Sequence, residues 1–263
     1  IRVFHQKNGG VSRARNLALS HARGRYLCFL DSDDTLDASF LEKLLAMRDQ
    51  AGEIPVCCGF EVRQEGAATQ PAKALPEKKI PLDRFLFELL IGRLGLPLCC
   101  VTWLMPAQTA LLARFDEELG YGEDSLFVAQ MLLHYREVWY DPQPLYYYLT
   151  DRAGNTVTER SLKKSESRYR SLEKTLDLCR GRLPQTEQAL IKQLVECASE
   201  GARAAKGEGR RGEYKAYKKR CLAWWKKLRR CPAISPRDRL RLLAYGLAPV
   251  LSERIMLKIY GRV

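Results

Sequence analysis

The chain has 263 residues, of which 46% are hydrophobic and 29% are charged, and this balance excludes an intrinsically disordered protein. Its net charge of +13 is unevenly placed, because residues 151–263 hold 28 Lys and Arg against 12 Asp and Glu, whereas residues 1–150 hold 16 against 19. We therefore expect two units with different partners, residues 1–159 and residues 160–263.

The cysteines and the first residues bear on the cellular setting. Nine cysteines occur without a C-x-x-C motif, and an odd number argues against a simple disulfide framework. We interpret them as reduced thiols of a cytoplasmic protein that pack as small apolar groups. The chain begins with Ile1 and enters an apolar run at once, so we expect that the start of a longer protein is missing.

The opening residues predict a strand, a helix and a second strand. The first strand is Ile1–His5 and the second is Tyr26–Leu30. The helix between them is indicated by apolar residues at helical spacing, which are Val11, Ala14, Ala18 and Ala22. This order is that of a βαβ unit, which favours a parallel sheet.

Three carboxylates follow the second predicted strand, in Asp31-Ser32-Asp33-Asp34. Open α/β sheets bind ligands beyond the carboxyl ends of their strands. Like charges at this spacing repel one another unless they are compensated, and a divalent cation that holds a phosphorylated substrate is one compensation. A helix cap is the alternative, because Asp accepts hydrogen bonds from the first amides of a helix. The six residues from Phe29 to Asp34 by themselves leave both interpretations open.

The rest of the front part alternates between strands and helices. Helices are predicted over Phe40–Arg48 and Leu82–Leu94 and after Glu123-Asp124, and strands over Val56–Arg63, Glu137–Tyr140 and Leu145–Leu149. Leu98–Met105 is too apolar to be exposed. The fold class predicted by this alternation is therefore α/β.

Two further groups could carry chemistry. Asp124 could act as a general base, although an acid in the first turn of a helix is also favoured by the helix dipole, as for Glu123. Asn8-Gly9-Gly10 precedes a helix and could present amides to a phosphate, but it matches neither the G-x-G-x-x-G nor the P-loop pattern. Arg15 in that helix could reach a diphosphate or be solvated.

Taken together, these motifs resemble a family 2 glycosyltransferase. The resemblance covers about 155 residues, and its order and spacing are more specific than any single motif. It is carried by Asn8-Gly9-Gly10-Val11-Ser12-Arg13-Ala14-Arg15-Asn16, Ala22-Arg23-Gly24-Arg25-Tyr26, Phe29-Leu30-Asp31-Ser32-Asp33-Asp34, Glu123-Asp124 and Pro144-Leu145-Tyr146-Tyr147-Tyr148 with Arg152.

The resemblance implies a Rossmann-like A-type glycosyltransferase fold and an inverting transfer from a nucleotide-diphosphate sugar, with Mn²⁺ or Mg²⁺. It implies a saccharide or lipid-linked acceptor in cell-surface polysaccharide or glycolipid synthesis. Asp31 and Asp33 would hold the metal and the donor, with Asp34 beside them, and Asp124 would be the base. The other implied donor contacts are Asn8, Gly10, Arg15 and Arg152.

The resemblance is incomplete at the start of the chain. The family begins with two strands that form the nucleoside pocket, and Ile1–His5 corresponds to the strand after them. The chain is thus expected to keep the metal and base side of the site, and its own activity is left open. Absence of the two strands would also expose a sheet edge.

The basic rear part predicts a series of amphipathic helices. Lys215–Arg230 contains Trp224 and Trp225 among eight Lys and Arg, a pattern that suits an anionic membrane surface. No nucleic-acid motif occurs, so nucleic acid is not the expected partner. The longest uncharged run, Leu242–Ser252, has 11 residues, about half of what a membrane-spanning helix needs. The alternatives are a solvated helical subdomain and a non-catalytic basic adaptor that binds membrane or nucleic acid.

Overall fold

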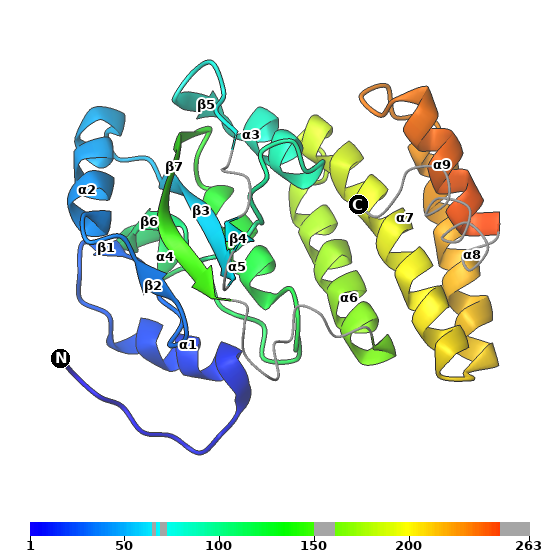
Figure 1. The fold of residues 1–263 in the computed structure, drawn as a ribbon, viewed down its shortest axis with the longest axis horizontal. Coiled ribbons are helices and arrows are strands. Elements are labelled where there is room, and N and C mark those ends of the chain that lie inside the picture. Colours follow the sequence, from blue (N-terminus) through cyan, green and yellow to red (C-terminus); the bar gives the residue numbers. More distant parts are fainter. Residues whose placement is uncertain (65–66, 69–72, 150–160, 248–263) are drawn as a thin grey trace. The chain divides into compact units, whose positions relative to one another are not determined.

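The computed structural model describes residues 1–64, 67–68, 73–149 and 161–247. The chain divides into two compact units, Ile1–Val157 and Thr158–Val263. The first unit is a mixed α/β unit around a sheet, and the second is helical throughout its described part (Figure 1). Each unit has its own core and is described by itself.

The sheet of the first unit is mixed rather than parallel. Its order is β1-β6-β3-β7-β2, with β4 added beside β3 and β5 beside β7. Only β3 and β7 pair in parallel among the strands described. The strands are β1 (Tyr26–Leu27), β2 (Thr35–Leu36), β3 (Val56–Gln64), β4 (Ala67–Ala68), β5 (Lys79–Pro81), β6 (Trp103–Pro106) and β7 (Glu137–Leu149).

Helices cover the sheet of the first unit. They are α1 (Gly10–His21), α2 (Phe40–Ala51), α3 (Leu82–Leu90), α4 (Ala107–Ala110) and α5 (Glu123–Leu132). Helix α2 packs against β3 and β7. It ends at Gly52, which has a φ of 83° and whose amide donates a hydrogen bond to the Arg48 carbonyl, and this closes the last turn. Figure 1 shows α2 to one side of β3 and β7, and α3 and α5 to the other.

The prediction that the chain opens with a βαβ unit is wrong. Ile1–His5 forms no strand, because no strand of the described chain lies beside it to complete a hydrogen-bond ladder. It is extended and exposed, held by the Phe4 ring on that of His21 and by the Arg2 guanidinium on the His21 carbonyl. The expected parallel sheet is replaced by a mainly antiparallel one.

Two further strand predictions need correction. Only Tyr26–Leu27 of the predicted Tyr26–Leu30 strand pairs, because β6 is shared: its first two residues pair with β3 and its last two with β1. The two strands predicted over residues 137–149 are one bent strand, β7. Its register against β3 shifts around Gly59, which packs against the backbone of Pro142 where a side chain would not fit.

The core of the first unit lies on both sides of β3. The Phe85 ring contacts the rings of Trp103 and Tyr140, with centroids 5.7 and 5.5 Å away. Cys57 and Cys58 of β3 are fully buried beside them. All nine cysteines of the chain are free and seven are buried, which confirms their prediction as core residues.

The second unit is a helical bundle built around one long helix, α7. Its helices are α6 (Leu162–Cys179), α7 (Pro184–Gly207), α8 (Arg211–Leu228) and α9 (Pro236–Leu247), and α7 packs against each of the other three. The Trp224 indole donates to the Tyr169 hydroxyl and the Trp225 indole to the Arg239 carbonyl, so both rings belong to the bundle. No helix among the described residues is long and apolar enough to cross a membrane.

Gly201 sets how closely α7 and α8 approach. A Cβ added there would overlap the Tyr217 ring, whereas one added at Gly212, early in α8, would meet nothing. We expect Gly201→Ala to lower the free energy of unfolding by about 1–3 kcal/mol through overpacking, despite the better helix propensity of Ala. Gly212→Ala should raise it by about 0.5–1 kcal/mol. Urea unfolding of both variants measures these free energies. The same change in unfolding free energy for Gly201→Ala and Gly212→Ala would contradict the prediction.

Candidate active site

The acidic residues form a tight turn that is fixed by β7. The Asp34 amide donates to the Asp31 carbonyl at 3.1 Å. The Tyr146 hydroxyl of β7 donates to Asp34 at 2.5 Å and accepts from the Asp31 amide at 3.3 Å, and the Leu149 amide donates to the other oxygen of Asp34. Burial raises the pKa of Asp34, against these hydrogen bonds. Asp34 thus faces β7, and its carboxylate holds the turn.

The helix-cap interpretation of the acidic cluster is wrong. Helix α2 begins only at Phe40, and its N-cap residue is Ser39. Asp37, outside the cluster, accepts hydrogen bonds from the amide of Ser39 and from the Tyr147 hydroxyl. The carboxylates at positions 31 and 33 are therefore free of any capping role.

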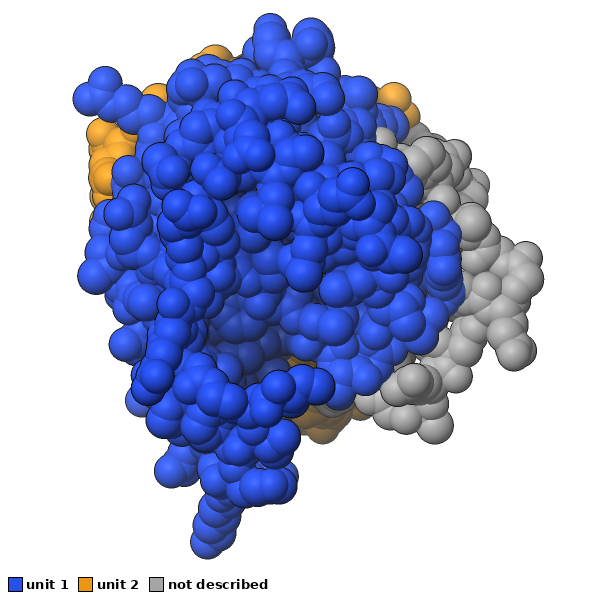
Figure 2. Space-filling view, turned by 90° about the vertical axis from the view of Figure 1, so that its left-hand side faces the viewer, with its two compact units in different colours: residues 1–157 blue, residues 158–263 orange. Residues whose placement is uncertain are grey.

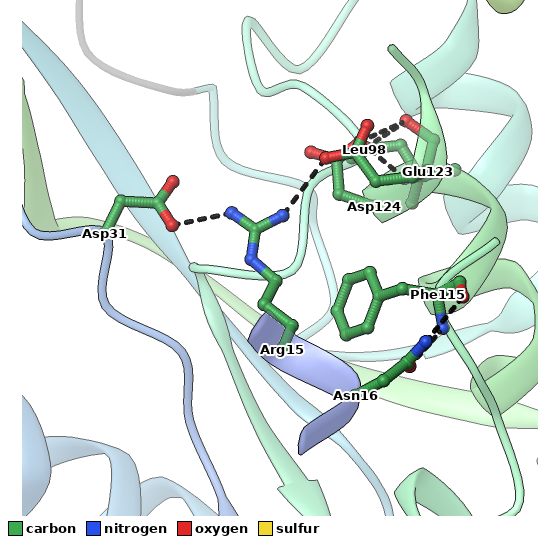
Figure 3. Close-up of polar contacts among 8 residues, drawn as sticks. Arg15, Asn16, Asp31, Leu98, Phe115, Glu123 and Asp124 are labelled. Atoms are coloured by element: carbon green, nitrogen blue, oxygen red, sulfur yellow. Dashed lines mark hydrogen bonds and ion pairs between the residues drawn. The ribbon is translucent and has the colours of Figure 1, made fainter. Parts of the chain in front are cut away.

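Arg15 joins the acidic turn to the start of α5 (Figure 3). Its guanidinium donates to Asp31 Oδ1 at 2.6 Å and to Glu123 Oε1 at 3.1 Å. The side chains of Arg15 and Glu123 are 13% and 11% exposed, and that of Asp31 is 37% exposed. Asp31 and Glu123, which lie 16 and 108 positions after Arg15 in the sequence, therefore both bind one partly buried guanidinium.

An aromatic ring and an amide position Arg15. The guanidinium lies 5.3 Å from the centroid of the Phe115 ring, a cation–π contact. Asn16, the next residue of α1, donates to the Phe115 carbonyl and accepts from the Phe115 amide, both at 2.9 Å. The Phe115 ring in turn stacks on that of Phe127 with centroids 4.1 Å apart. Helix α1 is thereby fixed to α5.

Asp124 lies in the first turn of α5, beside Glu123 (Figure 3). The helix starts there because Gly122 adopts a φ of 84°, which turns the loop into it. Asp124 Oδ1 accepts the Ser125 amide at 2.7 Å. Burial, and next the negative charge of Glu123, raise the pKa of Asp124 to about 6. A carboxylate with a pKa near neutrality is suited to accept a proton from a hydroxyl group.

A cavity of about 500 Å³ lies next to the acidic turn. One wall is α1, through Ala14 and Ala18, with Ala22 directly after the helix, and the other is the segment 27–32. Arg15 and Asp31 lie at its border. Figure 2 looks onto this side of the first unit and shows a hollow in its surface. The cavity gives the Arg15–Asp31 pair access to a ligand of small-molecule size.

The other predicted site residues are placed less closely together. Asp33 is exposed at the tip of the turn. Asn8 and Gly10 are exposed at the N-terminus of α1, where the Asn8 side chain accepts the Gly10 amide at 3.1 Å. Gly10 has a φ of 86°, which the turn requires. Arg152 lies outside the described residues.

The donor set fits a hard divalent cation only with help from a ligand. No group of three or more His, Cys, Asp or Glu in the described part of the chain could hold a metal ion by itself. Asp34 uses both oxygens for Tyr146 and Leu149, and Asp31 uses Oδ1 for Arg15, so a metal ion would be bound by the second oxygen of Asp31 and by Asp33. Mg²⁺ is commonly held by one or two carboxylates, with substrate phosphates and water completing its shell. The two residues fit such a site.

The sequence assigns no contact to three residues of this site. Asn16, Glu123 and Tyr146 each stand in a motif that carries the resemblance, but the motifs do not say what these side chains bind. Each acts across at least 99 residues of sequence. Periodicity describes a single element, so it does not reveal contacts between elements.

Part of the chain matches a known protein family. Residues 1–105 match the family described as "Glycosyl transferase family 2". EpsJ of Bacillus subtilis, named an uncharacterized glycosyltransferase, is 29% identical over 163 residues, 60% of this chain and 47% of its own length. The poly(ribitol-phosphate) beta-N-acetylglucosaminyltransferase TarS of Staphylococcus aureus is 28% identical over 164 residues, 60% of this chain and 26% of its own length. The chain spans less than half the length of these relatives.

A solved structure confirms the fold. TarS residues 1–349 of S. aureus, in complex with UDP-GlcNAc, match 98% of this chain and 73% of that chain with a TM-score of 0.62 and 17% identity. The expected A-type glycosyltransferase fold, followed by a helical region, is therefore present. At this identity the likeness concerns the fold.

Proposed function

We propose that the protein transfers a sugar from a nucleotide-diphosphate sugar to a hydroxyl acceptor, because residues 1–105 match glycosyl transferase family 2 and the chain has the A-type fold. The carrying observation is the carboxylate of Asp124, with a pKa near 6, beside the Arg15–Asp31 pair that borders the cavity. TarS binds UDP-GlcNAc in its structure, which makes this compound the first donor to test.

In the proposed reaction the acceptor hydroxyl attacks the anomeric carbon while its proton passes to Asp124. The new C–O bond forms on one face of the sugar, and the bond to the diphosphate breaks on the other, so the configuration inverts. The nucleoside diphosphate leaves with the electron pair of that bond. Asp124 is suited to this role because burial keeps its carboxylate basic near neutral pH.

Asp31 and Asp33 would hold a Mn²⁺ or Mg²⁺ ion together with the donor diphosphate. Such an ion offsets the charge that develops on the leaving phosphate. The exposed Asp33 is free to turn toward a ligand, while Arg15 keeps Asp31 at the border of the cavity. Asn8, Gly10 and Arg152 remain proposed donor contacts.

The test is an assay for release of nucleoside diphosphate by the longest form of the chain that its gene encodes. UDP-GlcNAc and other nucleotide sugars are supplied with Mn²⁺ or Mg²⁺ and saccharide or lipid-linked acceptors. Asp33→Asn should abolish metal-dependent turnover, while Asp49→Asn, an exposed acid of α2, should leave it unchanged. If no donor is turned over, the proposed transferase function is refuted. If turnover is undiminished in the presence of a metal chelator, the proposed metal dependence is refuted.

The acceptor proposed is a cell-surface saccharide or a lipid-linked one, met at the cytoplasmic face of the membrane. What supports this is an α8 basic stripe of exposed side chains without an acidic partner among the described residues. The stripe consists of Lys215, Lys219 and Lys226 of α8 and of Arg229 and Arg230, which directly follow the helix. Because both α8 indoles are committed within the bundle, the contact would be electrostatic rather than inserted.

Vesicle binding tests this contact. We expect salt-sensitive co-sedimentation with vesicles of phosphatidylglycerol and none with phosphatidylcholine, because each Lys or Arg near an anionic surface contributes about 1 kcal/mol. Lys215→Ala, Lys219→Ala and Lys226→Ala together should weaken binding, and Lys43→Ala on α2 serves as the control. Equal binding to both lipids would contradict the proposal, as would no binding to either.

A further inference from the structure

We propose that Glu123 is a positioning residue that sets the place of the acidic turn through Arg15, and this inference rests on the proposed transferase function. Glu123 contacts neither Asp31 nor the rest of the turn in the described structure. Its carboxylate instead accepts a hydrogen bond from Nη1 of the Arg15 guanidinium, and the carboxylate of Asp31 accepts one from Nη2. The turn and the start of α5 therefore share one cation (Figure 3).

The burial of the three side chains makes this link rigid. Arg15 and Glu123 are nearly buried, and a planar guanidinium donates in fixed directions, so its position is set by its more buried partner. The Phe115 ring under the guanidinium, 5.3 Å away, restricts it further. Asp31 is the more exposed end of the link, where a ligand from the cavity can meet it.

The charges explain why an acid is required at position 123. Arg15 faces Asp31 and Glu123, and its positive charge also acts on the thiol of Cys100 and on Asp124. With Glu123 neutral, a single carboxylate would hold Arg15, and the guanidinium would be free to follow the more exposed side chain of Asp31. The distance between the proposed metal ligand and the proposed base on α5 would then vary. Catalysis is sensitive to misplacement of about 1 Å.

The decisive variant is Glu123→Gln, which keeps the shape of the side chain and removes its charge. We expect kcat to fall about 10–100-fold while the KM for the donor changes by less than about threefold. The matched control is Glu117→Gln, because Glu117 also accepts a hydrogen bond from α1, through Asn16, but does not touch Arg15. Glu123→Asp, which retains the charge, should recover part of the loss.

A double variant separates positioning from a direct effect on Asp124. Adding Glu123→Gln to Arg15→Lys should lower kcat by less than about threefold beyond Arg15→Lys alone, because both changes break the same link. Fully additive losses would overturn the proposal, since they would mean that Glu123 acts on its neighbour Asp124 without Arg15. Wild-type turnover with an unaffected Glu123→Gln variant would also overturn it, while leaving the transferase function intact.

Hydrogen exchange tests the link without any turnover. The amides of Asp31 and Asp34 are hydrogen-bonded in the turn, 92 and 89 residues before Glu123. Glu123→Gln should accelerate their exchange at least severalfold, and Glu117→Gln should not. If exchange in the turn is unchanged, Glu123 does not position it. A wild-type chain without turnover would refute the transferase, and this measurement would still decide the positioning role.

Discussion

Asp124→Asn is expected to lower kcat by about 10²–10⁴-fold, the usual contribution of general base catalysis. The substitution keeps the side-chain oxygen that accepts the Ser125 amide, so the start of α5 should stay folded. The KM for the donor should change little, because Asp124 acts on the acceptor hydroxyl. Turnover at the wild-type rate would show that the base lies elsewhere.

The pH dependence gives a second measure of the same residue. Because Asp124 must be ionised to accept a proton and its pKa is about 6, kcat/KM should fall tenfold per pH unit below about pH 6. The residual activity of Asp124→Asn should lack this limb. A wild-type profile that is flat between pH 5 and pH 8 would contradict the assignment.

The pH dependence of folding stability should be opposite to that of kcat/KM, because Asp124 favours the folded state most when it is protonated. The folded-state pKa of Asp124 lies above its ordinary value of 3.8, so its contribution to stability is complete below about pH 4 and is lost as the pH rises through about 6. Asp124→Asn cannot ionise, and we expect it to be more stable than the wild type by about 2–3 kcal/mol at pH 7.5. A gain in stability with a loss of turnover excludes misfolding as the cause.

Arg15→Ala is expected to lower the free energy of unfolding of the first unit by about 2–4 kcal/mol. It leaves the nearly buried carboxylate of Glu123 without a partner, and removing one member of a buried ion pair costs about 3–5 kcal/mol. We place the effect lower because Asp31 is 37% exposed and solvent screens its charge. The same variant should have no measurable turnover.

The control for Arg15→Ala is Arg13→Ala, on the same helix. Arg13 is exposed, so its removal should change the free energy of unfolding by less than about 0.5 kcal/mol. The urea dependence of hydrogen exchange in peptides from α1 and α5 reports the first unit alone. An equal loss of unfolding free energy in both variants would show that Arg15 stabilises the helix itself and does not act through its ion pairs with Asp31 and Glu123.

The sequence predicted the elements that carry their own pattern. The helices now seen as α1, α2 and α5 follow apolar spacing, and the glycines at 52 and 122 end or begin them. The acidic turn was predicted because an apolar run ended in charges. These signals are local, so one segment is enough to reveal them.

Pairing between segments was predicted less well. Ile1–His5 has the composition of a strand, yet a strand forms only against a neighbour, and none of the described strands is available to it. The sharing of β6 between two strands and the bend of β7 at Gly59 depend on contacts 40 or more residues away. The contacts of Arg15 with Asp31 and Glu123 also join separate segments of the chain, so the pattern of one segment does not predict them.

The burial of the cysteines has a practical consequence for studying this protein. Burial raises the pKa of the Cys28 and Cys99 thiols to about 12, and burial also raises the pKa of the Cys57 thiol. Alkylating reagents attack the thiolate, so the native thiols should react slowly at neutral pH. A single cysteine introduced at an exposed site, such as Lys215 or Asp33, can therefore carry a fluorophore without first removing nine native residues.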